Sequence, residues 1–154
     1  MSNIEIINGD LLDLDVEVIV NPWNRNLIPF YYLVCQGVSK AIKKRVGIEP
    51  FKEVQKHGIV PLGTALITNS GNSKFKNIIH VAGINLLYQS SEYAIRKSVR
   101  NAMKVALEHN IKSIGFPIIG SGTGGLDKEK ALEYMISELD KINGDIKVVI
   151  AKYE

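Results

Sequence analysis

The sequence has little cysteine, no long apolar run and no large excess of charge of one sign. Cys35 is the only cysteine in the 154 residues, so no internal disulfide can form, and we expect a reducing, cytoplasmic setting. No apolar run approaches the length of a membrane span, and residues 1–8 lack the basic start and apolar core of a cleavable signal. The net charge of +3, from 19 basic and 16 acidic residues, does not by itself indicate nucleic-acid binding.

The length and the even composition predict a single domain over residues 1–154. A chain of this size buries roughly 70% of its unfolded surface without help from a metal or a disulfide. We find no internal repeat, linker or low-complexity tract, and we assign no metal site and no cofactor. Two basic clusters, at residues 40–45 and 96–104, have helical spacing and are expected to lie on solvated outer faces.

A glycine-rich stretch, Phe116–Asp127, is the feature around which the rest is organised. A short apolar run precedes it and a segment of helical period follows it, so the glycines form a turn from a strand to a helix. Glycine lets the backbone approach a ligand closely, and the free N–H groups at a helix start favour phosphate. Because a simple helix cap needs at most one glycine and this loop has four, an anion-binding loop is the better interpretation.

Alternating periodicities predict the remaining elements. Glu92–His109 is the clearest helix, with an apolar stripe opposite a charged one. Strands alternate with helices over the second half of the chain, which predicts an α/β domain with a central, mixed and mostly parallel sheet between helical layers. The expected strands are Ile4–Ile7, Val16–Val20 (stopped by Asn21-Pro22), Gly63–Asn69, Lys76–Val81, Ile111–Phe116 and Ile146–Ala151, and the other expected helices are Gly37–Val46, Pro50–His57 and Asp127–Ile142.

The segment from Asn21 to Gln36 is unusual because it contains two prolines yet is too apolar and aromatic for a solvated loop. It must pack against the domain core, a second copy of the chain or a ligand, and the core is the simplest of the three.

The arrangement of loops favours a diphosphate ligand. In open α/β sheets, ligands bind beyond the carboxyl ends of the strands, and two loops that each lead into a helix could hold two phosphates. Gly120-x-Gly122-x-x-Gly125 also matches the dinucleotide fingerprint, but only 29 residues follow it, too few for a second mononucleotide half. A P-loop is excluded because no Gly-Lys-Ser/Thr follows the glycines.

Five short motifs, in this order, resemble those of the macro domain family. They are Asn8-Gly9-Asp10-Leu11-Leu12, the run Val16–Asn21 leading to Asn24, Gly37–Ile42, Ile79–Gly83 and Phe116–Gly125, and together they span nearly the whole chain. The resemblance implies a three-layer α/β/α sandwich that binds ADP-ribose or a derivative.

The same resemblance assigns roles to individual residues. Asp10 would accept from the adenine amino group with Leu11 beside it, and Asn24 would bind the distal ribose. Tyr153, near the end of the last strand, would cover the adenine. The first diphosphate loop would consist of Gln36, Gly37 and Val38, and the second of Gly120, Ser121, Gly122, Thr123, Gly124 and Gly125.

The departures from the family pattern concern the chemistry. Ser39 occupies the place where hydrolytic members commonly have an acid, and Gly124 occupies the place of an aromatic residue in some branches. A hydrolase would therefore rely on other polar groups, with Asn24, Asn21 and Ser121 as candidates. In this interpretation His80 is a satisfied strand residue rather than a base, although a histidine would titrate in a useful range.

Three functions stay open at this point. The chain could hydrolyse an ADP-ribosyl linkage on protein or nucleic acid, or process ADP-ribose-1″-phosphate. It could instead read ADP-ribose without turnover, or bind another nucleotide or nucleic-acid end through stacking by Trp23, Phe30, Tyr31 and Tyr32.

Overall fold

A single mixed sheet forms the centre of the structure, a computed structural model that describes residues 3–24, 37–56, 61–84, 91–120 and 127–152. In this part of the chain six strands lie in the order β1–β6–β5–β2–β4–β3. All neighbours are parallel except β3, which runs antiparallel to β4. The strands are β1 (Asn3–Asn8), β2 (Val18–Asn24), β3 (Ala65–Thr68), β4 (Asn77–Ile84), β5 (Ser113–Pro117) and β6 (Lys147–Lys152).

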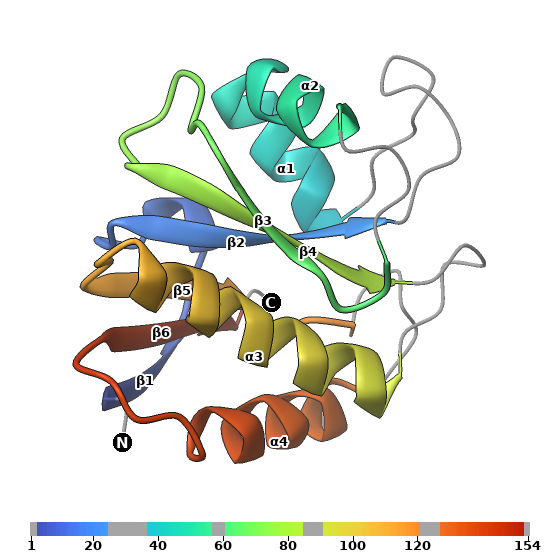
Figure 1. Cartoon of the computed structure of the whole chain (residues 1–154), viewed down its shortest axis with the longest axis vertical. Helices are drawn as coiled ribbons and strands as arrows, with labels where there is room; N and C mark the ends of the chain where they lie inside the picture. The colour runs from blue at the N-terminus through green and yellow to red at the C-terminus, as the bar shows by residue number, and fades with distance from the viewer. Residues whose placement is uncertain (1–2, 25–36, 57–60, 85–90, 121–126, 153–154) are drawn as a thin grey trace.

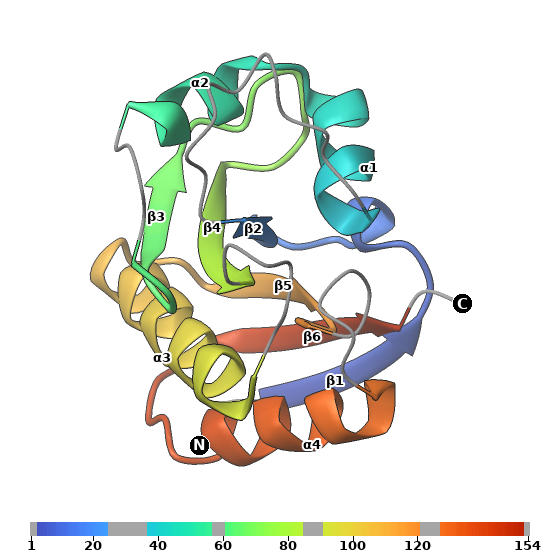
Figure 2. The same ribbon diagram turned by 90° about the vertical axis from the view of Figure 1, so that its right-hand side faces the viewer.

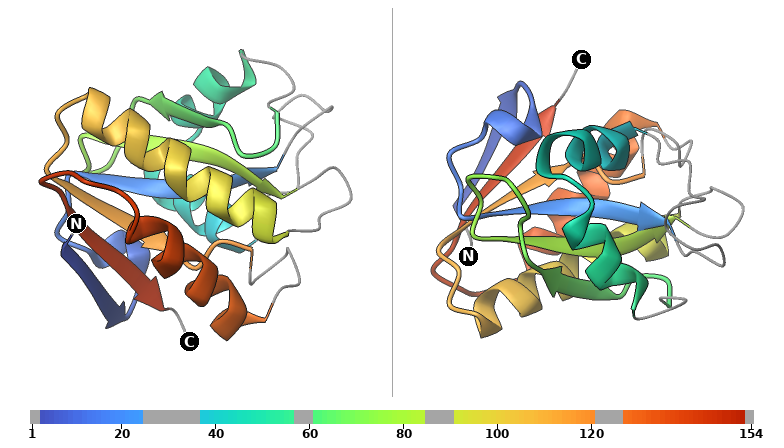
Figure 3. Two further views of the ribbon diagram at one scale, coloured as in Figure 1. Left: turned by 60° about the horizontal axis from the view of Figure 1, so that its bottom comes forward. Right: turned by 90° about the horizontal axis from the view of Figure 1, so that it is seen from above.

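Helices cover both faces of the sheet, which gives three layers (Figures 1 and 2). One face carries α3 (Glu92–Glu108) and α4 (Lys128–Leu139), and the other carries α1 (Gly37–Val46) and α2 (Glu49–Gln55) together with the short 3-10 helix η1 (Leu11–Asp13). The two views of Figure 3 show these two helical layers from below and from above. None of the described helices is long and apolar enough to cross a bilayer.

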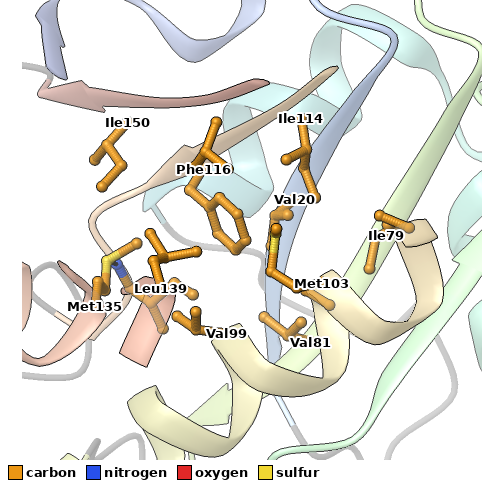
Figure 4. Packing of buried hydrophobic residues seen from close by; sticks show 14 of the residues in the cluster. Val20, Ile79, Val81, Val99, Met103, Ile114, Phe116, Met135, Leu139 and Ile150 are labelled. Atoms are coloured by element: carbon orange, nitrogen blue, oxygen red, sulfur yellow. Dashed lines mark hydrogen bonds between the residues drawn. The ribbon is translucent and has the colours of Figure 1, made fainter. Parts of the chain in front are cut away.

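The larger apolar core lies between the sheet and the α3–α4 pair (Figure 4). Phe116 of β5 is fully buried there, in the same cluster as Met103 of α3 and Met135 of α4. Strand residues at every second position face this core, while their neighbours Ile19 and Ile78 face the smaller core under α1 and α2. The sheet is therefore apolar on both faces, as expected for parallel strands covered by helices.

Most expected elements are confirmed within a few residues, and the strand after residue 16 is the main correction. The sequence placed it at Val16–Val20 and ended it before Pro22, whereas β2 begins at Val18 and continues through Pro22 to Asn24. Beyond Ile19, β2 pairs in register with β4 alone, with an irregularity between Pro22 and Asn24. A proline is tolerated there because a strand paired on one side needs fewer N–H donors.

The basic residues on α3 also differ from expectation. Instead of only facing solvent, Arg96 and Arg100 pair with Glu138 of α4, whose side chain is 3% exposed. Arg100 donates two hydrogen bonds of 2.8 and 2.9 Å to one Glu138 oxygen, and Lys141 lies 3.4 Å from the other. This cluster joins the two helices of one layer.

Candidate functional site

The candidate site is the edge of the sheet at which the parallel strands end. Because β1, β6, β5, β2 and β4 are parallel, their carboxyl ends meet at one edge, and α3 begins at the same side in Figure 1. The order along this edge is Asp10 after β1, Lys152 at the end of β6, Gly120 after β5 and Asn24 at the end of β2. Three strand spacings separate β1 from β2, a distance of roughly 14 Å.

Asp10 lies at the β1 end of this edge and has two possible uses. One carboxylate oxygen accepts a 2.9 Å hydrogen bond from the Leu12 backbone N–H, so Asp10 caps η1. Its second carboxylate oxygen makes no hydrogen bond to a described residue. The backbone N–H of Gly9 donates to the carbonyl of Lys152 at 3.0 Å, which ties the end of β1 to the end of β6. Asp10 thus has a fixed backbone and one carboxylate oxygen available to a ligand.

The position of η1 depends on Gly115 in β5. A Cβ at Gly115 would lie 2.8 Å from Cδ1 of Leu14, the C-cap of η1, which is closer than side chains normally approach, and at an ordinary contact distance of 3.4 Å from Leu11 Cδ1. The absence of a side chain therefore lets η1 pack against the sheet, with Leu11 buried beside Asp10. Leu11, predicted to lie next to the ligand, is 5% exposed in this structure.

At the β2 end, Asn21 is buried and bonded to a neighbouring strand. It pairs in register with His80 of β4, and its Nδ2 lies 2.9 Å from His80 Nδ1. Asn21 Oδ1 is buried and has no hydrogen-bond partner in the described part of the chain. Burying a carbonyl oxygen without a hydrogen-bond donor lowers the stability by about 1–3 kcal/mol. This oxygen is therefore a candidate acceptor for a ligand. The backbone of Asn24 lies three residues further along β2, and its side chain lies outside the described residues.

The described parts of the two predicted phosphate loops also reach this edge. Gly37 and Val38 form the first turn of α1, which begins beside the end of β2 in Figure 1. Gly120 follows β5 with φ at +85°, a left-handed conformation that favours glycine. Gln36, Ser121, Gly122, Thr123, Gly124, Gly125 and Tyr153 lie outside the described residues, as do Phe30, Tyr31 and Tyr32 of the aromatic segment. That the two loops bind one diphosphate stays a prediction.

His80 is confirmed as a satisfied strand residue, but the expectation that it titrates in a useful range is wrong. Its side chain is 2% exposed, and burial lowers its pKa from 6.5 to about 3, because the charged imidazolium is penalised away from water. Its Nε2 lies 2.8 Å from Thr68 Oγ1 of β3, a partner that the sequence did not indicate. The only sequence signal for this contact was that Thr68 and His80 are polar residues in otherwise apolar strands.

The layers and the strand order define an α/β/α sandwich. Its candidate site is elongated and runs along the edge at which the parallel strands end. Comparison with known proteins gives the family, since the macro domain model matches residues 20–135. The chain belongs to the macro domain family.

Relatives and solved structures agree with this assignment. An O-acetyl-ADP-ribose deacetylase of Escherichia fergusonii is 32% identical over 143 residues, covering 88% of this chain and 77% of that protein. A mutant of the Oceanobacillus iheyensis macrodomain, solved with ADP-ribose, superimposes with a TM-score of 0.84 at 26% identity, covering 99% of this chain and 86% of the other. The macrodomain of Mycobacterium tuberculosis DarG superimposes with a TM-score of 0.80 at 26% identity and covers 98% of each chain.

Proposed function

We propose that this chain binds ADP-ribose or an ADP-ribose derivative along the strand-end edge. The observation that carries the proposal is the order of groups there: the Asp10 carboxylate after β1, a left-handed Gly120 after β5, and the asparagines of β2. These groups match the adenine, the diphosphate and the distal ribose of one extended ligand. A macrodomain of the same fold, solved with ADP-ribose, supports the choice of ligand.

The proposal assigns each end of the ligand its own partners. The free Asp10 oxygen accepts from the adenine amino group beside Leu11, and Tyr153 covers the base. Gln36, Gly37 and Val38 hold one phosphate, and residues 120–125 hold the other, through backbone N–H groups aimed at the anion. Asn24 binds the distal ribose.

We further propose that the chain hydrolyses a linkage at the distal ribose. The similarity to a protein named O-acetyl-ADP-ribose deacetylase supports this step. In O-acetyl-ADP-ribose, for example, water held between the diphosphate and Asn24 would attack the acetyl carbonyl carbon, the bond from that carbon to the ribose oxygen would break, and acetate and the free ribose hydroxyl would be released, while Asn21, Ser121 and the loop N–H groups stabilise the charge that develops on the carbonyl oxygen. His80 is excluded as a general base because a histidine with a pKa of about 3 is a very weak base at neutral pH.

Binding without turnover is the second candidate, and the residue at position 39 favours it. Ser39 stands where hydrolytic members of the family commonly carry an acid, so the reacting water has one activating group fewer. Incubation with O-acetyl-ADP-ribose, ADP-ribosylated protein, ADP-ribosylated DNA and ADP-ribose-1″-phosphate separates the two functions. Product release from any of them supports the hydrolase, and no release over hours from all four supports the reader.

Calorimetry with ADP-ribose tests binding, and two substitutions of Asp10 test the site. Asp10→Asn keeps an oxygen that can cap η1 but offers an amide N–H₂ where the adenine amino group needs an acceptor, so we expect affinity to fall about tenfold with the stability unchanged. Asp10→Ala should lose both the affinity and about 1 kcal/mol of stability.

The control for these variants is Asp13→Asn, an exposed carboxylate in the same 3-10 helix. It should bind like the wild type. No binding of ADP-ribose at millimolar concentration would refute the proposed function, and equal affinity of Asp10→Asn and wild type would refute the adenine assignment alone.

A further inference from the structure

A line of three polar side chains crosses the otherwise apolar face of the sheet beneath α1 and α2. Asn21 of β2, His80 of β4 and Thr68 of β3 lie on adjacent strands and are 0%, 2% and 2% exposed. Phe51 of α2 contacts the His80 ring edge-on, with the ring centroids 5.8 Å apart. Each buried N–H and O–H in such a line needs an acceptor, so the positions of its hydrogen atoms follow from the contacts.

The assignment starts at Thr68. Its hydroxyl donates to the backbone carbonyl of Asn69 at 2.9 Å, and a hydroxyl has only one hydrogen to give. The 2.8 Å contact with His80 must therefore be a hydrogen bond that Thr68 Oγ1 accepts from Nε2–H. A neutral imidazole protonated on Nε2 has a lone pair on Nδ1, which accepts from the Asn21 amide at 2.9 Å.

This assignment fixes the orientation of the Asn21 amide. Its Nδ2 must face His80, and its Oδ1 must face away, where it is buried without a hydrogen-bond partner in the described part of the chain. Turning the amide over would place the carbonyl oxygen against the Nδ1 lone pair, which is repulsive. Asn21 lies three residues before the end of β2, close to the edge where the proposed ligand binds.

We infer that Thr68 and His80 are positioning residues, which hold the Asn21 carbonyl oxygen ready to accept a hydrogen bond from a hydroxyl of the bound ligand, directly or through one ordered water. This inference rests on the proposed function, because the hydroxyl is that of the distal ribose. Protonation of His80 would place an Nδ1–H donor against the Asn21 amide N–H, which is repulsive. Burial suppresses this protonation, since the pKa of His80 is about 3. The amide orientation is then the same throughout the neutral pH range.

A matched pair of substitutions at Thr68 tests the inference. Thr68→Val keeps the volume and removes the acceptor for His80 Nε2–H, so the imidazole can adopt the other tautomer and the amide can turn over. We expect ADP-ribose to bind about tenfold more weakly to this variant in calorimetry. Thr68→Ser keeps the hydroxyl and should restore affinity to within about twofold of the wild type.

A spectroscopic measurement keeps the test independent of ligand and of the folding of any variant. NMR of wild-type protein with ¹⁵N-labelled histidine should show His80 neutral, protonated on Nε2 and not on Nδ1, from pH 8 to pH 5. In Thr68→Val the Nδ1–H form should become populated, while Thr68→Ser keeps the wild-type pattern.

The outcomes separate this inference from the proposed function. A wild-type protein that fails to bind ADP-ribose refutes the proposed function, and with it the role of the Asn21 oxygen toward the ligand. Wild-type binding with undiminished affinity in Thr68→Val refutes the positioning role alone. A wild-type His80 protonated on Nδ1 refutes the amide orientation whatever the ligand result.

Discussion

At the scale of single residues, we predict that His80 makes the stability of the fold depend on pH, besides the positioning role inferred above. Burial lowers its pKa from 6.5 to about 3, so below pH 6.5 the unfolded chain takes up a proton that the folded chain does not. The folded state therefore loses stability as the pH falls, by about 0.7 kcal/mol per pH unit at pH 6.5, where the unfolded histidine is half protonated, and by nearly 1.4 kcal/mol per pH unit at pH 5. We expect denaturant unfolding between pH 6.5 and pH 5 to show this slope.

His80→Gln provides the comparison, because glutamine cannot take up a proton in this range. The mean slope between pH 6.5 and pH 5 should be smaller in the variant by about 1.1 kcal/mol per pH unit, whatever its stability at pH 7.5. The other two histidines, His57 and His109, are present in both proteins and cancel. The window above pH 5 also avoids Glu138, whose stabilising effect is lost only as the pH falls through a folded pKa below its usual range. Equal slopes in the two proteins would contradict the buried, neutral assignment.

The same residues show what the sequence could and could not predict at this scale. Asp10 was predicted as a ligand group, and the structure shows that it also caps η1 with one carboxylate oxygen while leaving the other oxygen available. Asn21 was predicted as a polar helper, but Thr68 was not singled out. Thr68 and His80 are 12 positions apart, and their contact depends on β3 pairing antiparallel with β4, which no local pattern predicts.

At the scale of elements, the cluster of charged side chains around Glu138, which connects α3 and α4, is the feature to test. Burial alone would raise the pKa of Glu138, but hydrogen bonds from Arg100 and Lys141 outweigh it and keep that pKa below its usual range. Glu138→Gln removes the charge and leaves both arginines without their shared carboxylate. We expect the free energy of unfolding to fall by about 1.5–3 kcal/mol, because hydrogen bonds to charged groups contribute that much to stability.

Glu133→Gln is the control for this prediction, since Glu133 is on the exposed side of the same helix. Its effect should stay within about 0.5 kcal/mol. Both variants are measured by urea unfolding at pH 7, and equal effects would show that the α3–α4 cluster is only a surface ion pair.

The helices were easier to predict than the strands for a physical reason. The apolar stripe of α3 repeats over 17 residues, and its ends carry local signals, the N-cap Ser91 and the left-handed Asn110 that follows the C-cap His109. The ends of β2 depend instead on which strands lie beside it, and Pro22 fits only because β5 no longer pairs at that point. The close packing of η1 on Gly115 likewise needs the three-dimensional arrangement.

At the scale of the whole molecule, the site joins parts of the chain that are far apart in sequence. Asp10 follows the first strand, Gly120 follows the fifth and Lys152 ends the sixth, and only the sheet order brings them to one edge. The motif order in the sequence indicated the family fold, but the distance between the ends of the site comes from the strand order. A ligand that contacts all of them must stabilise the fold as a unit.

Thermal unfolding with and without ADP-ribose measures this coupling. A ligand at 100 times its dissociation constant adds about 2.7 kcal/mol when it binds only the folded state, and 1 kcal/mol raises the Tm of a domain of this size by about 2–4 °C. We therefore expect Tm to rise by about 5–11 °C for the wild type, and by about half as much for Asp10→Asn at the same ADP-ribose concentration, because a tenfold weaker affinity lowers the stabilisation to about 1.4 kcal/mol. Adenosine, which lacks the diphosphate and the distal ribose, should give a much smaller shift at that concentration. Equal shifts with adenosine and ADP-ribose would mean that only the β1 end of the edge binds, and the site would then not extend to β2.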